Sequence, residues 1–300
     1  MAAKPLGGVY APVATLFDGD GELDLVRYAK NLDWYCGTPL DGIVMLGSNG
    51  EFAALDFDER LRLIEAGAEA IDGRKTVLAG TGAESTKHTI HLTREAARLG
   101  VEYALVVTPH YYRPRYDRQA YLNHYQAVAE ASPIPVLVYI MTTYTGVDLA
   151  TDIVAELSQH PNIAGVKDSA GSAPKLAEMV AKSSDDFAVL AGSASFLYPA
   201  LCVGAKGGIV ALGNVAPREC AELYDLFQAG KHDEARALQH RLLDPNAAVT
   251  SRFGIAGLKA AMDIVGLETS DPRPPQRPAS DEERAAIEKI FDDARLLASA

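Results

Sequence analysis

Short apolar runs recur along the chain, and each is followed by a polar or glycine-bearing turn and then by a stretch with helical periodicity. The runs are rich in Val, Ile, Leu and Ala, as is typical of strands buried on both faces of a parallel sheet. They begin near Val9, Gly42, Lys75, Tyr103, Pro135, Ile163, Phe187 and Gly207. About eight strand–helix units of this length predict a closed (β/α)8 barrel, with a doubly wound open sheet as the alternative.

The alternation stops after the eighth run. From residue 217 on, the chain shows helical patterns alone, interrupted by a proline-rich stretch over residues 271–278. The last helix is expected to start at Ser280, and Glu283 three residues later completes a capping-box spacing. We therefore expect a barrel that carries the active site over residues 1–215 and a C-terminal helical region over residues 216–300.

The charge balance narrows the class of partner. The 300 residues include 28 Lys and Arg against 40 Asp and Glu, which gives a net charge of −12 at pH 7. Nucleic acids and anionic membranes are bound largely through clustered basic side chains, so we expect neither as a partner. A small molecule is the expected ligand of such an acidic protein.

Two further features favour a cytoplasmic protein. The apolar runs are all shorter than the roughly 20 residues of a membrane helix, and residues 1–8 lack the apolar core of a secretory signal. Three widely spaced cysteines, Cys36, Cys202 and Cys220, are typical of reduced thiols rather than of a disulfide framework.

Lys167 is the most informative single residue. It ends the apolar run that starts at Ile163, and a lysine at the end of a buried strand is poorly hydrated. Poor hydration favours the neutral amine, which is a nucleophile toward carbonyl carbon. The alternative is that Lys167 reaches water or pairs with its neighbour Asp168.

Further polar groups stand at the predicted carboxyl ends of other strands, where (β/α)8 enzymes carry their chemistry. They are the turn Gly47-Ser48-Asn49-Gly50-Glu51 after the second strand, Thr108 to Tyr112 after the fourth, Tyr139 on the fifth and Ala191-Gly192-Ser193 on the seventh. Each alone is ordinary, because such a turn is usually only a turn and a strand tyrosine usually packs. Together with Lys167 they indicate an active site.

These groups form a coherent site if the substrate is a 2-keto acid. The Ser48 and Asn49 amides and the Ser48 hydroxyl would bind its carboxylate, and the flanking Gly47 allows close approach. Lys167 would attack the adjacent ketone, and the Tyr139 phenol would give and take protons. The resulting iminium is an electron sink, so a carbon–carbon bond two carbons away can break without a metal or any other cofactor.

This set of motifs resembles the dihydrodipicolinate synthase / N-acetylneuraminate lyase family of pyruvate-handling class I aldolases, over essentially the whole chain. The resemblance implies a (β/α)8 barrel with a C-terminal helical bundle, a Schiff base on Lys167 and Tyr139 as the proton-relaying phenol. It also implies that Tyr111 acts in the neighbouring subunit's site, and so a homotetramer built from dimers. The backbone carbonyl of Ile209 matches a position that helps to orient the site.

Within the family, three features favour 4-hydroxy-2-oxoglutarate aldolase. The turn carries Ser48-Asn49 where synthases and sialate lyases usually carry two hydroxyl residues. Residues 157–163 and 238–255 are similar to that aldolase. Tyr144 stands where a synthase usually presents an arginine to the carboxylate of its aldehyde substrate. We therefore expect cleavage of 4-hydroxy-2-oxoglutarate, or a similar 4-hydroxy-2-keto acid, to pyruvate and glyoxylate or another aldehyde.

Ser169 and Gly192 complete the expected contacts with the substrate. The Ser169 hydroxyl can hydrogen-bond a small polar aldehyde, and Gly192 lies on the same rim of the predicted barrel.

The alternatives within the family are the lysine-biosynthesis synthase, 4-hydroxy-tetrahydrodipicolinate synthase, and an aldolase or dehydratase of 2-keto-3-deoxy sugar acids.

The chain departs from the family after the catalytic tyrosine. Where Asn-x-Pro is common, this sequence has Ile140, Met141 and Thr142. Loss of the proline removes a fixed φ, and loss of the asparagine removes a polar partner. We expect a differently shaped strand end and an aldehyde pocket made more apolar by Ile140, Met141 and Tyr144, which leaves a larger or aromatic aldehyde as an alternative.

Two rival functions come from other classes. A metal-dependent class II aldolase needs clustered ligands, and His88 and His91 are three residues apart on a predicted helix, but helical histidines are more often solvated. A non-catalytic keto-acid sensor would keep the carboxylate turn and could dispense with Lys167 and Tyr139, yet both are present.

Overall fold

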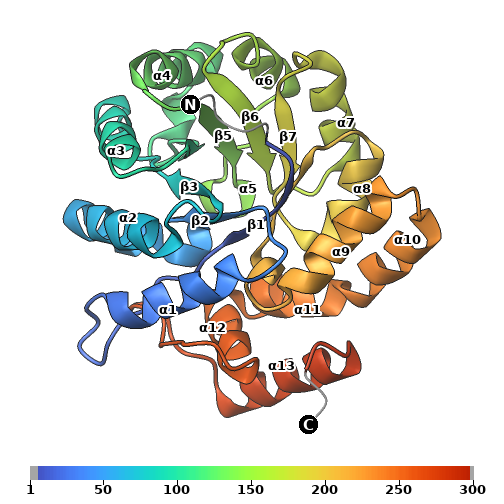
Figure 1. The fold of residues 1–300 in the computed structure, drawn as a ribbon. Helices are drawn as coiled ribbons and strands as arrows, with labels where there is room; N and C mark the ends of the chain where they lie inside the picture. Colours follow the sequence, from blue (N-terminus) through green and yellow to red (C-terminus); the bar gives the residue numbers. More distant parts are fainter. Residues whose placement is uncertain (1–5, 298–300) are drawn as a thin grey trace.

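The computed structural model describes residues 6–297 and contains a closed barrel of parallel strands in the order β1 to β8 (Figure 1). The strands are β1 (Gly8–Pro12), β2 (Gly42–Met45), β3 (Thr76–Gly80), β4 (Tyr103–Val107), β5 (Val136–Ile140), β6 (Ile163–Asp168), β7 (Ala188–Ala191) and β8 (Gly207–Ile209). Closure between β1 and β8 confirms the (β/α)8 prediction and excludes the open sheet.

Helices follow the strands and form the outer layer of the barrel (Figure 1). They are α1 (Leu25–Cys36), α2 (Phe57–Ile71), α3 (Thr86–Arg98), α4 (Arg118–Ala131), α6 (Thr151–Leu157), α7 (Ala173–Lys182) and α8 (Leu197–Cys202), whereas the short α5 (Thr142–Thr145), between β5 and α6, lies near the middle of the barrel in Figure 1. Side chains before several of them accept a backbone hydrogen bond from the first turn, as Asp24 does for α1 and Ser85 for α3. These caps fix where the helices begin.

The chain after β8 is helical. It forms α9 (Pro217–Gln228), α10 (His232–Arg241), α11 (Leu243–Ala247), a π-helical turn (Ala248–Arg252), α12 (Gly254–Ile264) and α13 (Asp281–Asp293). The expected capping box at Ser280 and Glu283 starts α13. In Figure 1 these helices are orange and red, and α12 and α13 lie below α1. The division into regions at residue 215 stays a prediction.

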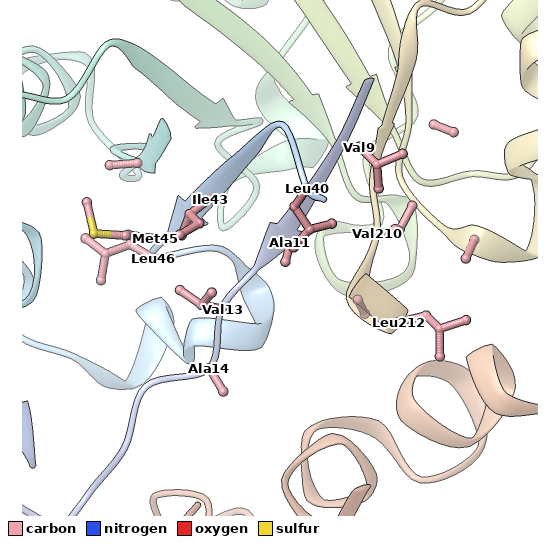
Figure 2. Packing of buried hydrophobic residues seen from close by; sticks show 14 of the residues in the cluster. Val9, Ala11, Val13, Ala14, Leu40, Ile43, Met45, Leu46, Val210 and Leu212 are labelled. Atoms are coloured by element: carbon pink, nitrogen blue, oxygen red, sulfur yellow. The ribbon is translucent and has the colours of Figure 1, made fainter. Parts of the chain in front are cut away.

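Alternate residues of each strand serve two separate layers of core. Val9, Ala11, Ile43 and Met45 point out toward the helices and belong to the large cluster drawn in Figure 2. Tyr10 and the other residues between them point into the barrel, where a second cluster fills the interior. This period of two follows from strand geometry, and it requires apolar residues on both faces, which explains the continuous apolar runs in the sequence.

Two structural features bear on the expected location of the protein. Within residues 6–297, no helix combines the length and the apolar character that crossing a membrane requires. Cys36, Cys202 and Cys220 are all unpaired. The cytoplasmic location stays a prediction.

Candidate active site

Lys167 lies near the end of β6, directly beside Tyr139 of β5. The two residues are register partners in the parallel ladder, and the lysine Nζ lies 4.2 Å from the centroid of the Tyr139 ring. Lys167 is 3% exposed. Because successive strand residues point to opposite faces, Asp168 faces the other way and bonds to Lys175 (2.8 Å) and to the Ala170 amide (2.8 Å). The alternative of a Lys167–Asp168 pair is therefore not what the structure shows.

The Tyr139 phenol links the lysine to the turn after β2. Its hydroxyl lies 3.2 Å from the Ser48 hydroxyl, and the tyrosine is 4% exposed. Lysine, phenol and serine hydroxyl thus lie in sequence at the carboxyl ends of β6, β5 and β2. The three sequence-predicted residues are brought together by the barrel.

The turn after β2 is one turn of 3-10 helix over Ser48–Gly50. The Gly50 and Glu51 amides close it by donating to the carbonyls of Gly47 (3.0 Å) and Ser48 (3.1 Å). Amides at the start of a helical turn have no intrahelical acceptor, so those of Ser48 and Asn49 are available to an anion. The position of the turn agrees with the expected carboxylate site.

A cavity of about 470 Å³ lies at this end of the barrel. Its near wall carries the predicted residues Ser48, Asn49, Tyr139, Lys167, Ser169 and Gly192. Its far wall comes from α5 and from residues 243–255 of the C-terminal helices. Among the described residues that line it, Lys167 is the one charged side chain.

Ser169 and Gly192 depend on each other. A Cβ atom at Gly192 would lie 2.0 Å from the Ser169 hydroxyl, so a glycine is needed there. The Gly192 amide donates to the Asp168 carbonyl (2.7 Å), which holds β7 close to the end of β6. The Ser169 hydroxyl is buried and has no hydrogen-bond partner among the described residues. Its role as a contact for the substrate stays a prediction.

Tyr111 and Ile209 do not line the cavity within one chain. Tyr111 lies in the loop after β4, is 75% exposed and packs edge-on against Tyr112 at 4.9 Å. That exposure is compatible with a role in a neighbouring subunit, which stays a prediction. Ile209 lies on β8 with its side chain in the barrel interior, and the role of its carbonyl stays a prediction.

The segment after Tyr139 corrects one expectation. Met141 and Tyr144 line the cavity as expected, but Ile140 is fully buried and packs in the outer layer, so the expectation that it lines the pocket was wrong. Ile140 follows an inward-facing residue and must therefore face outward. Tyr144 lies on α5 and is 58% exposed. Partial desolvation raises the pKa of its phenol, and the neighbouring Tyr139 adds to the effect.

Sequence reasoning missed the far wall of the cavity. Asn246 of α11 is buried and donates to the hydroxyls of Ser193 (3.1 Å) and Thr250 (3.4 Å), and Thr250 donates back to the Asn246 carbonyl (2.5 Å). Thr250 lies in the π-helical turn, a feature often found at functional sites. The available signal was a polar pair four residues apart in an otherwise apolar helical stretch.

The histidine pair considered as metal ligands lies away from this cavity. His88 and His91 are exposed on α3, and His91 stacks on Phe57 with ring centroids 4.8 Å apart. Across residues 6–297, no three His, Cys, Asp or Glu side chains are grouped in a way that could hold a metal ion. Independence from metal stays a prediction.

The fold and site define a barrel enzyme with a buried lysine in a cavity at the carboxyl ends of its strands. The chain belongs to the dihydrodipicolinate synthetase family, whose model matches residues 5–294. It is 35% identical to a probable mitochondrial 4-hydroxy-2-oxoglutarate aldolase of Emericella nidulans, covering 98% of this chain and 97% of that protein. It is 33% identical to a 4-hydroxy-tetrahydrodipicolinate synthase of Geotalea daltonii, covering 97% and 99%.

The fold also matches solved structures of this family. One is a prophage protein of the dihydrodipicolinic acid synthase family from E. coli K12, solved in complex with pyruvate. Its TM-score is 0.92 at 29% identity, with 98% of this chain and 100% of that chain covered. The family assignment from the sequence motifs is confirmed, and the chain is a lyase of this family.

Proposed function

We propose that the protein is a class I aldolase that forms a Schiff base on Lys167 and cleaves 4-hydroxy-2-oxoglutarate, or a similar 4-hydroxy-2-keto acid, to pyruvate and glyoxylate. One observation carries the proposal: the buried Lys167 amine lies over the Tyr139 ring, and the Tyr139 hydroxyl lies 3.2 Å from Ser48 in the turn suited to a carboxylate.

Imine formation comes first. The Ser48 and Asn49 amides hold the substrate's C1 carboxylate, which places the C2 ketone against the Lys167 amine. The amine nitrogen adds to C2, and its proton passes to the oxygen to give a carbinolamine. Tyr139 protonates the C2 hydroxyl, which leaves as water and gives the iminium.

Carbon–carbon cleavage follows. The Tyr139 phenolate removes the proton of the C4 hydroxyl, and the electron pair of the C3–C4 bond moves to form the C2=C3 double bond of an enamine while the iminium nitrogen becomes neutral. Glyoxylate is released from C4 and C5. Tyr139 then returns its proton to C3, and water hydrolyses the imine to release pyruvate and the free amine. Side chains of the protein and water donate and accept every proton in this sequence, so we expect that the reaction requires no metal.

Separate observations support the assignment of glyoxylate as the aldehyde product. The relative from Emericella nidulans is a probable 4-hydroxy-2-oxoglutarate aldolase. By the family resemblance, Tyr144 stands where a synthase presents an arginine, which disfavours the synthase reaction. A second candidate substrate is a 2-keto-3-deoxy sugar acid. The far wall favours it, because Asn246, Thr250 and their neighbours offer neutral hydrogen-bonding groups and no cation for a second carboxylate.

The assembly belongs to the same proposal. Tyr111 is exposed and lies away from its own cavity, which supports a role in the site of a neighbouring subunit within a homotetramer. Sedimentation of the purified protein measures the assembly directly. An isolated monomer with full activity would contradict this role for Tyr111.

Borohydride trapping tests the chemistry. Incubation with pyruvate and borohydride, followed by intact mass measurement, should add one reduced pyruvyl group per chain. Lys167→Ala should lose both the adduct and the cleavage activity, whereas Lys182→Ala, which removes an exposed lysine paired with Glu178, should keep both. An adduct that persists in Lys167→Ala would remove Lys167 from the mechanism, and the absence of any wild-type adduct would favour a keto-acid sensor or a class II enzyme.

A further inference from the structure

Two strained residues flank the turn that is suited to a carboxylate. Leu46 (φ 54°) and Glu51 (φ 53°) both adopt the left-handed backbone conformation, one on each side of Gly47–Gly50. Residues other than Gly, Asn and Asp rarely adopt this conformation, because the Cβ of an L-residue approaches the following carbonyl. Such strain persists only where surrounding contacts hold it, and it is concentrated at functional sites.

Packing holds the first side of the turn. Leu46 is buried in the outer core layer (Figure 2), and its carbonyl lies so close to β3 that a Cβ atom at Gly80 would approach it to 2.0 Å. The Thr15 hydroxyl donates to the Gly50 carbonyl (2.6 Å) and ties the turn to the segment after β1. None of these contacts involves a charge.

A buried carboxylate holds the other side. Glu51 Oε1 lies 2.7 Å from the Lys259 Nζ, and both side chains are almost fully buried. Glu51 Oε2 accepts from the Arg273 amide (2.9 Å) and from the Gln276 side chain (3.2 Å). A buried charge is costly unless it is paired and hydrogen-bonded. Here Oε1 is paired with the Lys259 ammonium without a hydrogen bond of good geometry, Oε2 accepts two hydrogen bonds, and all three partners lie more than 200 residues further along the chain.

The partners of Glu51 are themselves fixed. In addition to its ion pair with Glu51, Lys259 donates to the Ser270 hydroxyl (3.2 Å) and to the Asp271 carbonyl (3.0 Å). The Arg273 guanidinium makes two bonds to Glu59, one through NH1 (2.8 Å) and one through NH2 (2.6 Å). Lys259 and Arg273, which bind the Glu51 carboxylate, are therefore held in place by further contacts of their own.

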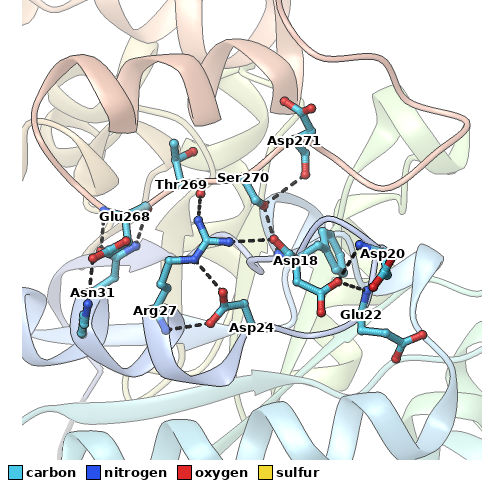
Figure 3. A network of polar contacts seen from close by, with 12 residues as sticks. Asp18, Asp20, Glu22, Asp24, Arg27, Asn31, Glu268, Thr269, Ser270 and Asp271 are labelled. Atoms are coloured by element: carbon cyan, nitrogen blue, oxygen red, sulfur yellow. Dashed lines mark hydrogen bonds and ion pairs between the residues drawn. The ribbon is translucent and has the colours of Figure 1, made fainter.

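The segment after α12 is in turn tied to the barrel. Figure 3 shows Arg27 of α1 donating to the Thr269 carbonyl, and the Phe17 amide donates to Ser270 (3.0 Å). The Phe17 ring lies between two cations, with Lys259 at 4.7 Å and Arg273 at 4.4 Å from its centroid. The contacts of Glu51 thus connect the turn to a fixed network and not to a loose loop.

We propose that Glu51 is a positioning residue, whose carboxylate, held by Lys259 and the Arg273 amide, keeps the Ser48 and Asn49 amides aimed at the carboxylate of the 2-keto acid. The inference rests on the proposed function, because it requires that this turn bind the keto acid. It assigns to the C-terminal helices a part in substrate binding. Glu51 does not line the cavity that holds Lys167, so it acts through the turn and touches no reacting atom.

Two substitutions separate positioning from charge balance. Glu51→Asp keeps the charge and tolerates the left-handed backbone, but it shortens the reach to Lys259 by one methylene. Glu51→Gln keeps the length and leaves the Lys259 cation unpaired. We expect both to raise the pyruvate concentration for half-maximal borohydride trapping by about ten- to a hundredfold, the usual effect of disturbing a charged hydrogen bond. The trapped fraction at saturating pyruvate and kcat should stay within about threefold of wild type.

Glu102→Gln is the matched control. It replaces one carboxylate oxygen by an amide nitrogen, as Glu51→Gln does, on a side chain that accepts from the Val77 amide (3.1 Å) near the start of β3, outside the Glu51 network, and it should not move half-saturation more than about twofold. Three results would overturn the proposal: a Glu51→Asp variant with wild-type half-saturation, an equal shift in Glu102→Gln, or a fall in kcat with half-saturation unchanged. A wild-type protein that traps no pyruvate would instead reject the proposed function. If Glu51→Gln does not fold, Glu51→Asp decides.

Discussion

The two halves of the cavity are built differently. The half that we assign to the keto acid consists of residues at strand ends, Lys167, Tyr139 and Ser48, which are buried or partly buried and fixed by the sheet register and by contacts with each other. The half that we assign to the aldehyde consists of helical residues, Tyr144 on α5 and Asn246 on α11, and Tyr144 is 58% exposed. Rigid strand ends suit a chemistry that stays constant, and the surrounding helices and loops suit a specificity that varies.

The comparison predicts its largest effect at Tyr139. Tyr139→Phe should lower kcat for cleavage by about 10² to 10⁴, because a positioned acid or base contributes that much. The ring still packs in the barrel, so Tm should change little. Tyr224→Phe, which removes a hydroxyl from a side chain of α9 outside the cavity, is the control and should keep full activity. A fully active Tyr139→Phe enzyme would show that water or another group moves the proton.

The keto-acid half could be predicted from the sequence for a physical reason. The strands are continuous apolar runs, so their starts could be located to within one residue of the observed ones, and the carboxyl ends of parallel strands must share one rim. The sequence alone therefore predicts Lys167 and Tyr139 on neighbouring strand ends. The error at Ile140 came from treating the adjacent residues Ile140 and Met141 as facing one pocket, although the strand continues through Ile140 and turns its side chain outward.

The aldehyde half could not be predicted in the same way. Asn246 and Thr250 reach the cavity from a segment more than 75 residues beyond Lys167, and no local pattern states which face of that helix meets the barrel. The Glu51–Lys259 pair has the same character, since each residue is an ordinary charged position until the fold buries them together. Contacts that depend on how helices dock are fixed by tertiary packing, which sequence periodicity does not report.

Tyr144 tests whether the aldehyde half sets specificity. Condensation of pyruvate with aspartate semialdehyde should be poor in the wild type, because a charged hydrogen bond to the aldehyde's carboxylate is worth about 1.5 to 3 kcal/mol, or roughly ten- to a hundredfold in rate. Tyr144→Arg should recover part of that loss while half-saturation for pyruvate trapping stays unchanged. Tyr144→Phe, which adds no cation, is the control. Faster semialdehyde condensation than cleavage in the wild type would contradict the branch assignment but not the Schiff base.

Lowering the pH should affect both halves of the cavity together, because it acts on the stability of the whole fold. The titrating group is a buried histidine that lies outside the cavity. His124 of α4 is 5% exposed, and its Nδ1 lies 2.9 Å from the Thr86 hydroxyl. Burial lowers the pKa of His124 to about 4, against an effect of Glu84 in the opposite direction. The unfolded chain, with a histidine pKa of about 6.5, then binds more protons between these two values, so the free energy of unfolding falls as the pH falls from 6.5 toward 4.

At pH 5 this histidine should cost about 2 kcal/mol of stability relative to pH 8. Urea unfolding at both pH values measures it, and in urea near the unfolding midpoint trapping and cleavage should decline in parallel as the folded fraction falls. His124→Gln should lose this part of the pH dependence, whereas His88→Gln, at an exposed position, should keep it. A pH dependence that is equal in all three proteins would place the acid sensitivity elsewhere.

Chelation should have the smallest effect of all. The proposed iminium does the polarising that a divalent ion does in a class II aldolase, so EDTA should leave both pyruvate trapping and cleavage unchanged in both halves of the site. The measurement is kcat before and after dialysis against EDTA, with the metal content of the protein determined on the same samples. If EDTA abolished cleavage and zinc restored it while trapping persisted, the aldehyde half would need a metal that the keto-acid half does not. Loss of both would replace the lysine mechanism with a metal-dependent one.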